Sequence, residues 1–387
     1  MIANRDEVMR PDLPVVREMI KKGLAAGGSL GKAAFRAFGL DFRFPPKEPK
    51  YFDMELSNRC NLDCKMCWFH GDRGIGDRYE NQELTSQEVF RFLDQIAKYD
   101  PNIYIGGTEP FVRSDFLPIL RHMKSRNIPV SFTTNGLLMN NDTTEELLSI
   151  GVDSIYFSID GNEEIHDLER GKGAFGKATS VIRKISEIKK RESSTKPIIN
   201  VNMTITNRLL GTIGEALDSI RNSTNDGIDS LVIHHLRYLT PNELSKHRFR
   251  VWRSLGCHAP GAASHLVPDY QISDPTALAD EIIGFRGRSK ISMFPDLNYM
   301  DLVHYYSEGP CSKKRCIAPL RGVVIKPNGD VLFCPDEWID DYVLGNIRQQ
   351  DIAEIWNGER ARKFRSALYR EKHFPACKRC SWMYAFG

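Results

Sequence analysis

The sequence lacks several features that would place it in a specialised class. No apolar run reaches the roughly 18 residues that a membrane span requires, and the polar start of the chain argues against a secretory signal. No sign of charge dominates, because 53 Lys and Arg stand against 50 Asp and Glu, which does not predict nucleic acid or an acidic partner. Repeats and low-complexity tracts are missing, and 41% hydrophobic residues exclude a disordered or collagen-like chain. We expect a cytoplasmic globular protein, whose 387 residues allow two or three domains.

Cysteine, by contrast, is frequent. Nine cysteines in a cytoplasmic chain favour metal ligands or redox centres over disulfides, and the odd number supports this interpretation. They form a tight group near the start, one isolated member, and a looser group near the end: Cys60, Cys64 and Cys67; Cys257; Cys311, Cys316, Cys334, Cys377 and Cys380. The sequence therefore predicts two separate metal or redox centres.

The middle of the chain alternates β-type runs with helical patterns. Thr85 and Ser114 are expected to cap the first two helices. Six βα units in succession predict a parallel sheet with right-handed crossovers, either an open doubly wound sheet or a partial barrel. In both cases the active site is expected at the carboxyl ends of the strands. The expected strands are 51–56, 102–107, 130–134, 154–160, 198–205 and 230–238, with helices near 85–99, 114–126, 142–150, 175–191 and 208–222.

Four segments follow from this pattern. Residues 1–50 are expected to form a helical extension, and 51–238 an α/β unit. Residues 239–310 form a linker or insert, with helices around 241–255 and 275–286 and a β-type run at 291–297. Residues 311–387 hold five of the nine cysteines and predict a small metal-stabilised domain with a helix around 350–370.

The first cysteine group has the spacing C-x3-C-x2-C and directly follows the first strand. Three thiolates on one loop can hold three irons of a 4Fe–4S cluster and leave the fourth iron open for another ligand. The alternative is a structural zinc site, which His70, three residues after Cys67, would complete. Spacing alone leaves both interpretations open.

This cysteine spacing, at this place in a βα series, resembles the signature of the radical S-adenosylmethionine (radical SAM) superfamily. The resemblance covers residues 51–238 and implies a partial (β/α)6 barrel of the TIM type. It also implies that the open iron binds SAM, which is reduced and cleaved to a 5′-deoxyadenosyl radical that abstracts a substrate hydrogen. Met66 departs from the aromatic residue often found before the third cysteine.

The resemblance also implies SAM contacts at the ends of the strands. Gly106, Gly107, Thr108 and Glu109 resemble the motif that meets the SAM amino group, although Thr108 stands where a second glycine is usual. Further contacts are implied at Thr134 and Asn135 with the ribose, and at Ser158 and Arg170 with the carboxylate. The G-x-G-x-x-G run at 171–176 does not follow its strand closely enough for a dinucleotide site, so we expect a loop and a helix start.

The second cysteine group resembles a Twitch domain, the shorter relative of the SPASM domain. Its pattern is Cys316, then Gly329, Cys334, and finally Cys377-x2-Cys380, with Cys311 outside it. Asn328-Gly329 predicts a β-hairpin that brings Cys316 and Cys334 together. The resemblance implies one auxiliary 4Fe–4S cluster for electron transfer, because no cysteine follows Cys380. A four-cysteine zinc site is the alternative.

Residues that exchange protons are less evident. We expect candidates in the sixth strand, after the 291–297 run and after Cys334: His234, His235, Asp296 and Glu337, with Asn298 and Asp336 nearby. Cys257 is expected to be a small core residue.

The resemblance implies an oxidoreductase or maturase. The short first segment favours oxidation or rearrangement of a small-molecule or carbohydrate-type substrate. Peptide or protein maturation is the alternative, and a non-catalytic zinc or iron–sulfur protein is a remote one. A flavodoxin or ferredoxin is the expected reductant.

Overall fold

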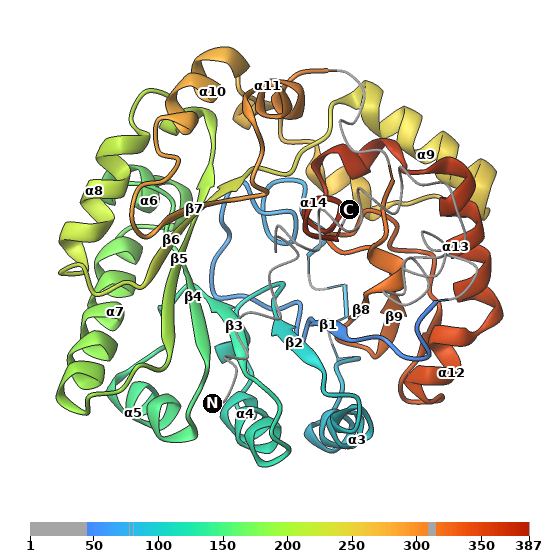
Figure 1. The fold of residues 1–387 in the computed structure, drawn as a ribbon, viewed down its shortest axis with the longest axis horizontal. Coiled ribbons are helices and arrows are strands. Elements are labelled where there is room, and N and C mark those ends of the chain that lie inside the picture. Colours follow the sequence, from blue (N-terminus) through green and yellow to red (C-terminus); the bar gives the residue numbers. More distant parts are fainter. Residues whose placement is uncertain (1–44, 77, 80, 309–314, 387) are drawn as a thin grey trace, which may run out of the picture.

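One curved sheet forms the centre of the molecule (Figure 1). The computed structural model describes residues 45–76, 78–79, 81–308 and 315–386. The strand order is β10-β9-β8-β1-β2-β3-β4-β5-β6-β7, parallel from β8 to β7, with β9 and β10 antiparallel at one edge. The strands are β1 (Tyr51–Met54), β2 (Asn102–Ile105), β3 (Ser131–Thr134), β4 (Ser154–Ser158), β5 (Ile198–Ile205), β6 (Ser230–His235), β7 (Ile291–Phe294), β8 (Gly322–Ile325), β9 (Asp330–Leu332) and β10 (Gly345–Asn346).

Alternation along the strands divides the sheet into two faces. In β1 to β4 and β6, fully buried side chains alternate with half-buried ones. The buried ones pack on helices: Phe52 contacts Phe92 of α3 and Phe132 contacts Phe116 of α4. The half-buried ones, which are mostly polar, line the other face, called the inner face below.

Helices follow most strands and cover the outer face, as Figure 1 shows for α3 to α8. Thr85 caps α3 with a capping box, as expected. Ser114 is not the N-cap of α4, because the helix begins one residue later and Asp115 occupies the N-cap position. Residues 110–112 form a 3₁₀ turn before it, and Arg113 pairs with the Asp115 carboxylate. The helices are α3 (Ser86–Ala97), α4 (Phe116–Ser125), α5 (Asn141–Ile150), α6 (Glu163–Arg170), α7 (Ala174–Arg191), α8 (Ile213–Ser223), α9 (Pro241–Leu255), α10 (Pro275–Ile283), α11 (Tyr299–Tyr306), α12 (Ile352–Asn357), α13 (Glu359–Glu371) and α14 (Ser381–Phe386).

The expected α/β fold with a mostly parallel sheet is confirmed, but the sheet has more than six strands. The 291–297 run supplies β7, which pairs with β6. The expected hairpin is β8–β9, and β8 pairs in parallel with β1, so the C-terminal segment continues the same sheet. The single helix expected at 350–370 is two, separated at Gly358.

Two other expectations concern the ends of elements. The glycine run at 171–176 joins α6 to α7, with Gly173 left-handed (φ 82°) before the helix, as expected for a loop and helix start. The helical extension expected in residues 1–50 lies mostly outside the described residues, which begin at Pro45. Among the helices of the described part of the chain, none has the length and apolar character of a membrane span.

Candidate active site

The first cysteine group lies on the loop after β1. The N–H of Cys67 donates to the carbonyl of Cys64 (2.9 Å) and the N–H of Gly71 donates to that of Cys67 (2.8 Å), so the chain turns tightly. Burial raises the pKa of the Cys60 thiol to about 11 and that of Cys64 to about 12. All three thiols are free. Two half-buried free thiols and one buried one on a single tight loop fit a cluster that takes them as thiolates.

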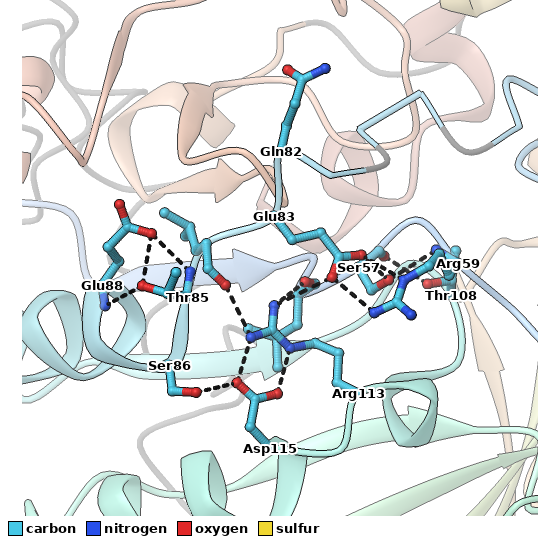
Figure 2. A network of polar contacts seen from close by, with 12 residues as sticks. Ser57, Arg59, Gln82, Glu83, Thr85, Ser86, Glu88, Thr108, Arg113 and Asp115 are labelled. Atoms are coloured by element: carbon cyan, nitrogen blue, oxygen red, sulfur yellow. Dashed lines mark hydrogen bonds and ion pairs between the residues drawn. The ribbon is translucent and has the colours of Figure 1, made fainter.

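Polar contacts fix the start of this loop (Figure 2). Arg113 donates to the carbonyls of Leu56 (2.9 Å) and Leu84 (3.0 Å) and pairs with Asp115 (2.7 Å). Arg59, next to Cys60, forms a two-pronged pair with Glu83 (3.1 and 3.0 Å). Because Arg113 is 93% buried and all its contacts are charge-assisted or to backbone, it holds the cysteine loop against β2 and α3.

Glu109 lies in the loop after β2, and its buried carboxylate faces the end of β3. Thr134 Oγ1 lies 2.9 Å from both carboxylate oxygens, and the N–H groups of Asn135 (2.7 Å) and Phe111 (3.2 Å) donate to the same carboxylate. Three donors leave one of its four acceptor positions for a ligand ammonium. Asn135 also donates to Asn61 in the cysteine loop (2.9 Å), so the structure brings Glu109, Thr134 and Asn135 to that loop.

Burial raises the pKa of Glu109 to about 7, against the lowering effect of its hydrogen bonds. A carboxyl group whose pKa is higher in the folded state stabilises the fold below about pH 4.5, and this contribution is lost as the pH rises through 7. Between pH 5 and 8, Glu109→Gln should therefore flatten the pH dependence of the unfolding free energy by about 2–3 kcal/mol. Urea unfolding of both proteins without SAM at four pH values measures this. Parallel curves would contradict the assignment.

The two glycines of this motif are required by close neighbours. A Cβ at Gly106 would lie 2.7 Å from Tyr104 Cε1, and one at Gly107 would lie 3.0 Å from Glu55 Cγ. Gly107 also has φ +96°, which only glycine adopts without strain. Thr108, at the unusual position, donates to the carbonyl of Ser57 (2.7 Å) and so ties the motif to the cysteine loop.

Arg170 lies beside the cysteine loop, and its guanidinium group is already engaged by protein side chains. Its Nε donates to Asp160 (2.6 Å) and its Nη1 lies 3.8 Å from the sulfur of Cys64. Asp160 is itself held by the N–H of Thr204 (2.8 Å). Ser158 ends β4 opposite Asn202 on the inner face. The structure therefore brings Ser158 and Arg170 to the end of the sheet where the resemblance requires SAM, with Arg170 also near a thiol.

In the second cysteine group, the other proposed ligands lie around Cys334. Burial raises the pKa of Cys334, and the nearby thiols of Cys377, Cys380 and Cys316 raise it further. The hairpin supplies Cys334, and the 3₁₀ helix η7 (Pro375–Arg379) delivers Cys377 and Cys380. Cys257 is buried in the core as expected, and it contributes to the same pKa. Cys311 lies outside the described residues.

A chain of side chains connects the two cysteine groups. Arg237, which follows β6, lies over the ring of Trp68 at 5.0 Å, and Trp68 follows Cys67. The same guanidinium pairs with Asp336, two residues after Cys334. Asp336 and Glu337 both have left-handed backbones (φ 59°), a strained conformation that concentrates at functional sites.

Next to this link, Lys326 forms a buried ion cluster. Its ammonium group, 1% exposed, contacts Glu55 of the β1 end and Glu337. Burial raises the pKa of Glu55 to about 7. Burial opposes the charge on Lys326, but the two carboxylates outweigh it and raise the lysine pKa. The cluster therefore locks the C-terminal segment to β1.

Asp53 is a residue that the sequence analysis missed. It lies on the inner face of β1, where its carboxyl group makes no hydrogen bond or ion pair with another described residue. Burial raises its pKa, and Glu55 and Asp336 raise it further. The signal was present in the sequence: in Tyr-Phe-Asp-Met-Glu, two carboxylates alternate with core residues of a strand.

The expected proton-exchanging residues divide in two. His234 lies on the inner face, and burial lowers its pKa to about 3, so the ring is neutral at pH 7. Glu337 is buried in the ion cluster described above. His235 is not at the site, because alternation turns it to the outer face, where its Nδ1 lies 2.9 Å from the Tyr306 hydroxyl. Asp296 is not at the site either: its side chain is 73% exposed and pairs with Arg286. Asn298 caps α11.

The zinc interpretations depend on side chains close enough to share one ion. His70 Nε2 lies 2.6 Å from the carbonyl oxygen of Asn58. Within residues 45–76, 78–79, 81–308 and 315–386, no three His, Cys, Asp or Glu side chains are grouped closely enough to hold a single metal ion.

Two family models match the chain. That of the radical SAM superfamily matches residues 54–206, and that of the SPASM iron–sulfur cluster-binding domain matches residues 316–381. The first includes Cys60, Cys64 and Cys67, and the second includes Cys316, Cys334, Cys377 and Cys380. Each model therefore covers one of the two cysteine groups.

Curated relatives match most of the chain. The tungsten-containing aldehyde ferredoxin oxidoreductase cofactor-modifying protein of Pyrococcus furiosus is 25% identical, over 86% of this chain and 87% of that protein. The mycofactocin maturase MftC of Mycolicibacterium smegmatis is 24% identical, over 84% and 74%. The AdoMet-dependent heme synthase of Methanosarcina barkeri is 36% identical, but over 33% of this chain and 36% of that protein.

Solved structures share the fold. Streptococcus suis SuiB bound to S-adenosylmethionine superposes with a TM-score of 0.58 at 15% identity, covering 91% of this chain and 78% of SuiB. AnSMEcpe with bound AdoMet gives 0.56 at 16% identity, covering 87% and 88%. The matched domains imply SAM, a 4Fe–4S cluster and auxiliary iron–sulfur centres as cofactors. Residues 54–206 thus match the radical SAM superfamily, and residues 316–381 match the SPASM iron–sulfur cluster-binding domain, so both matched regions are of the radical SAM/SPASM type.

Proposed function

We propose that this chain oxidises or rearranges a small polar organic molecule on the inner face of the sheet, as an oxidoreductase of the radical SAM type. The observation that carries this proposal is the link from Trp68 through Arg237 to Asp336, because it joins the two cysteine groups beside the inner face. A substrate there would lie near both redox centres.

The first redox centre is assigned to Cys60, Cys64 and Cys67, with SAM held by the loop after β2 and the ends of β3 and β4. When bound, the reduced cluster and SAM supply a 5′-deoxyadenosyl radical that takes a hydrogen atom from the substrate. Glu109 would accept a hydrogen bond from the SAM ammonium at its remaining lone pair. The SAM contacts proposed here are Gly106, Gly107, Thr108, Glu109, Thr134, Asn135, Ser158 and Arg170.

The second redox centre is assigned to Cys316, Cys334, Cys377 and Cys380. Four thiolates can saturate a cluster, which favours electron transfer over direct binding of substrate. On the inner face, Asp53 and His234 have free hydrogen-bonding capacity toward a ligand, whereas Lys326 and Glu337 are occupied by each other. Asp53 is therefore the proposed substrate contact, and it would accept a hydrogen bond from a hydroxyl or amine group.

A second candidate is peptide or protein maturation. MftC is named as a maturase, and SuiB has been solved with its precursor peptide SuiA. The relative from Pyrococcus furiosus is named as a cofactor-modifying protein, which favours the small-molecule candidate.

Deuterium transfer distinguishes the two candidates. The reconstituted, dithionite-reduced protein is given SAM together with one deuterated candidate substrate at a time. The candidates are the small-molecule intermediates of the pathway that the neighbouring genes encode, and any peptides that those genes encode. We expect deuterium from one carbon of a small molecule to appear in 5′-deoxyadenosine. The deuterated substrate should become lighter by about three mass units if it is oxidised, because one deuterium and one hydrogen leave, and by about one mass unit if it is rearranged and hydrogen replaces the lost deuterium. Transfer from a peptide alone would replace the first candidate by the second.

A further inference from the structure

Two helices beside the auxiliary cysteines expose large aromatic side chains. Phe249 and Trp252 of α9 are 58% and 54% exposed, and Tyr369 of α13 is 49% exposed. The two helices are joined where Arg250 and Ser254 contact Glu371, and Figure 1 shows them together at the edge of the molecule. Exposed Trp and Tyr beside Arg are the side chains that carry most of the binding energy in protein interfaces.

The sequence of α9 produces this exposure through its periodicity. Leu244, His247, Val251 and Leu255 repeat at helical spacing and are buried. Lys246, Phe249 and Arg253 follow the opposite stripe, with Trp252 beside it, and Arg253 lies over the Phe249 ring at 5.9 Å. The helical periodicity of α9 therefore places the aromatic rings of Phe249 and Trp252 outside the core.

The same surface is basic. Glu243, the carboxylate of α9, is buried against Arg379. On α13, Glu371 pairs with Arg250 and also lies 3.7 Å from Arg253, which leaves Glu359 as the unpaired acid of these two helices. We call this the α9–α13 surface, and it consists of Lys246, Phe249, Trp252, Arg253, Arg362, Lys363, Tyr369 and Arg370. The balanced charge of the whole chain conceals it, since composition does not show where charges gather.

The inner sides of both helices reach the auxiliary cysteines. His247 Nδ1 of α9 accepts from the N–H of Ala376, next to Cys377 (3.4 Å). The N–H of Cys316 donates to the carbonyl of Lys372, which follows α13 (3.0 Å). Only one layer of helix therefore separates the α9–α13 surface from the assigned electron-transfer centre.

Resting on the proposed function of that centre, we propose that the α9–α13 surface is the docking site of an acidic one-electron carrier protein of the flavodoxin or ferredoxin kind. The positive charge of this surface favours an acidic partner. Its position beside the auxiliary cysteines favours a partner that exchanges electrons. A substrate peptide would have to reach the inner face instead. Such complexes are small, transient and weakened by salt.

The test measures binding to the iron-loaded full chain, with a purified flavodoxin and a purified [2Fe–2S] ferredoxin as probes. We expect one of them to bind the wild type in 50 mM NaCl, and its Kd to rise at least about tenfold in 300 mM NaCl. Two double variants should each weaken binding about tenfold or more: Phe249→Ala with Trp252→Ala, and Arg253→Glu with Lys363→Glu. The charge-reversal pair should also reduce the salt dependence.

The matched control reverses Lys177 and Lys190, two exposed lysines of α7, and should leave the Kd unchanged, because α7 lies at the opposite edge of the molecule from α9 and α13 (Figure 1). Iron content and dithionite-driven 5′-deoxyadenosine formation should remain at wild-type levels in all variants, which separates failed docking from a failed function. Unchanged affinity in the α9–α13 variants, equal loss in the α7 control, or no binding of either carrier would overturn the proposal. Binding of an acidic peptide alone would replace the carrier by a peptide partner.

Discussion

Replacement of Cys60, Cys64 and Cys67 together by alanine is expected to abolish the formation of 5′-deoxyadenosine. The three thiols are the proposed ligands of the SAM-binding cluster, and they share one tight loop with no disulfide. Iron should fall from about eight to about four per chain, because the auxiliary cysteines remain. Anaerobic reconstitution, iron analysis and chromatography of the nucleoside product measure both effects.

The matched control for this variant is Cys257→Ala, since Cys257 is also buried but stands outside both proposed ligand sets. It should retain about eight irons and full nucleoside formation. A triple variant that still cleaved SAM, or that kept all its iron, would show that these cysteines are not the ligands. Equal loss in the Cys257 variant would point to general instability of the fold.

Replacement of Lys326 by methionine is expected to destabilise the protein by about 3–5 kcal/mol, since breaking a buried ion pair leaves uncompensated charge. The ammonium group is 1% exposed and serves both Glu55 and Glu337. Without it, these carboxyl groups must take up protons on folding, which becomes more costly as the pH rises. The loss should therefore be larger at pH 8 than at pH 5 in urea unfolding.

Two comparisons make the Lys326 result specific. Lys190→Met removes an exposed ammonium group of α7 and should change stability by less than about 0.5 kcal/mol. Adding Glu55→Gln and Glu337→Gln to the Lys326 variant should recover part of the loss, because no buried charge then remains. A loss below about 1 kcal/mol, or one independent of pH, would contradict the ion cluster.

Local patterns in the sequence were sufficient for the strands and for most helices. The apolar runs predicted β1 to β6 within three residues at their ends, and the capping residue Thr85 was confirmed. Ser114 was wrong because its neighbour Asp115 is held by Arg113, a contact that the capping pattern does not contain. The cysteine spacings predicted both redox centres because thiolate ligands of one cluster repeat at short intervals.

Contacts between distant segments were not predictable in the same way. Parallel pairing of β8 with β1 joins residues about 270 positions apart, and no periodicity in either segment encodes the partner. Lys326 and Asp53 each look like an ordinary polar residue at a strand, and their importance comes from what surrounds them. His235 and Asp296 were wrong for the converse reason, since one turns to the outer face and the other to solvent.

The most direct measurement of the central claim is electron paramagnetic resonance of the dithionite-reduced protein with Cys316, Cys334, Cys377 and Cys380 replaced by alanine. In this variant the cluster on Cys60, Cys64 and Cys67 remains alone. We predict a reduced 4Fe–4S signal whose g-values shift when SAM is added, with nuclear coupling to isotopes placed in the SAM amino and carboxylate groups. A protein that gives no paramagnetic signal, or a signal that SAM leaves unchanged, would contradict an open iron at this loop.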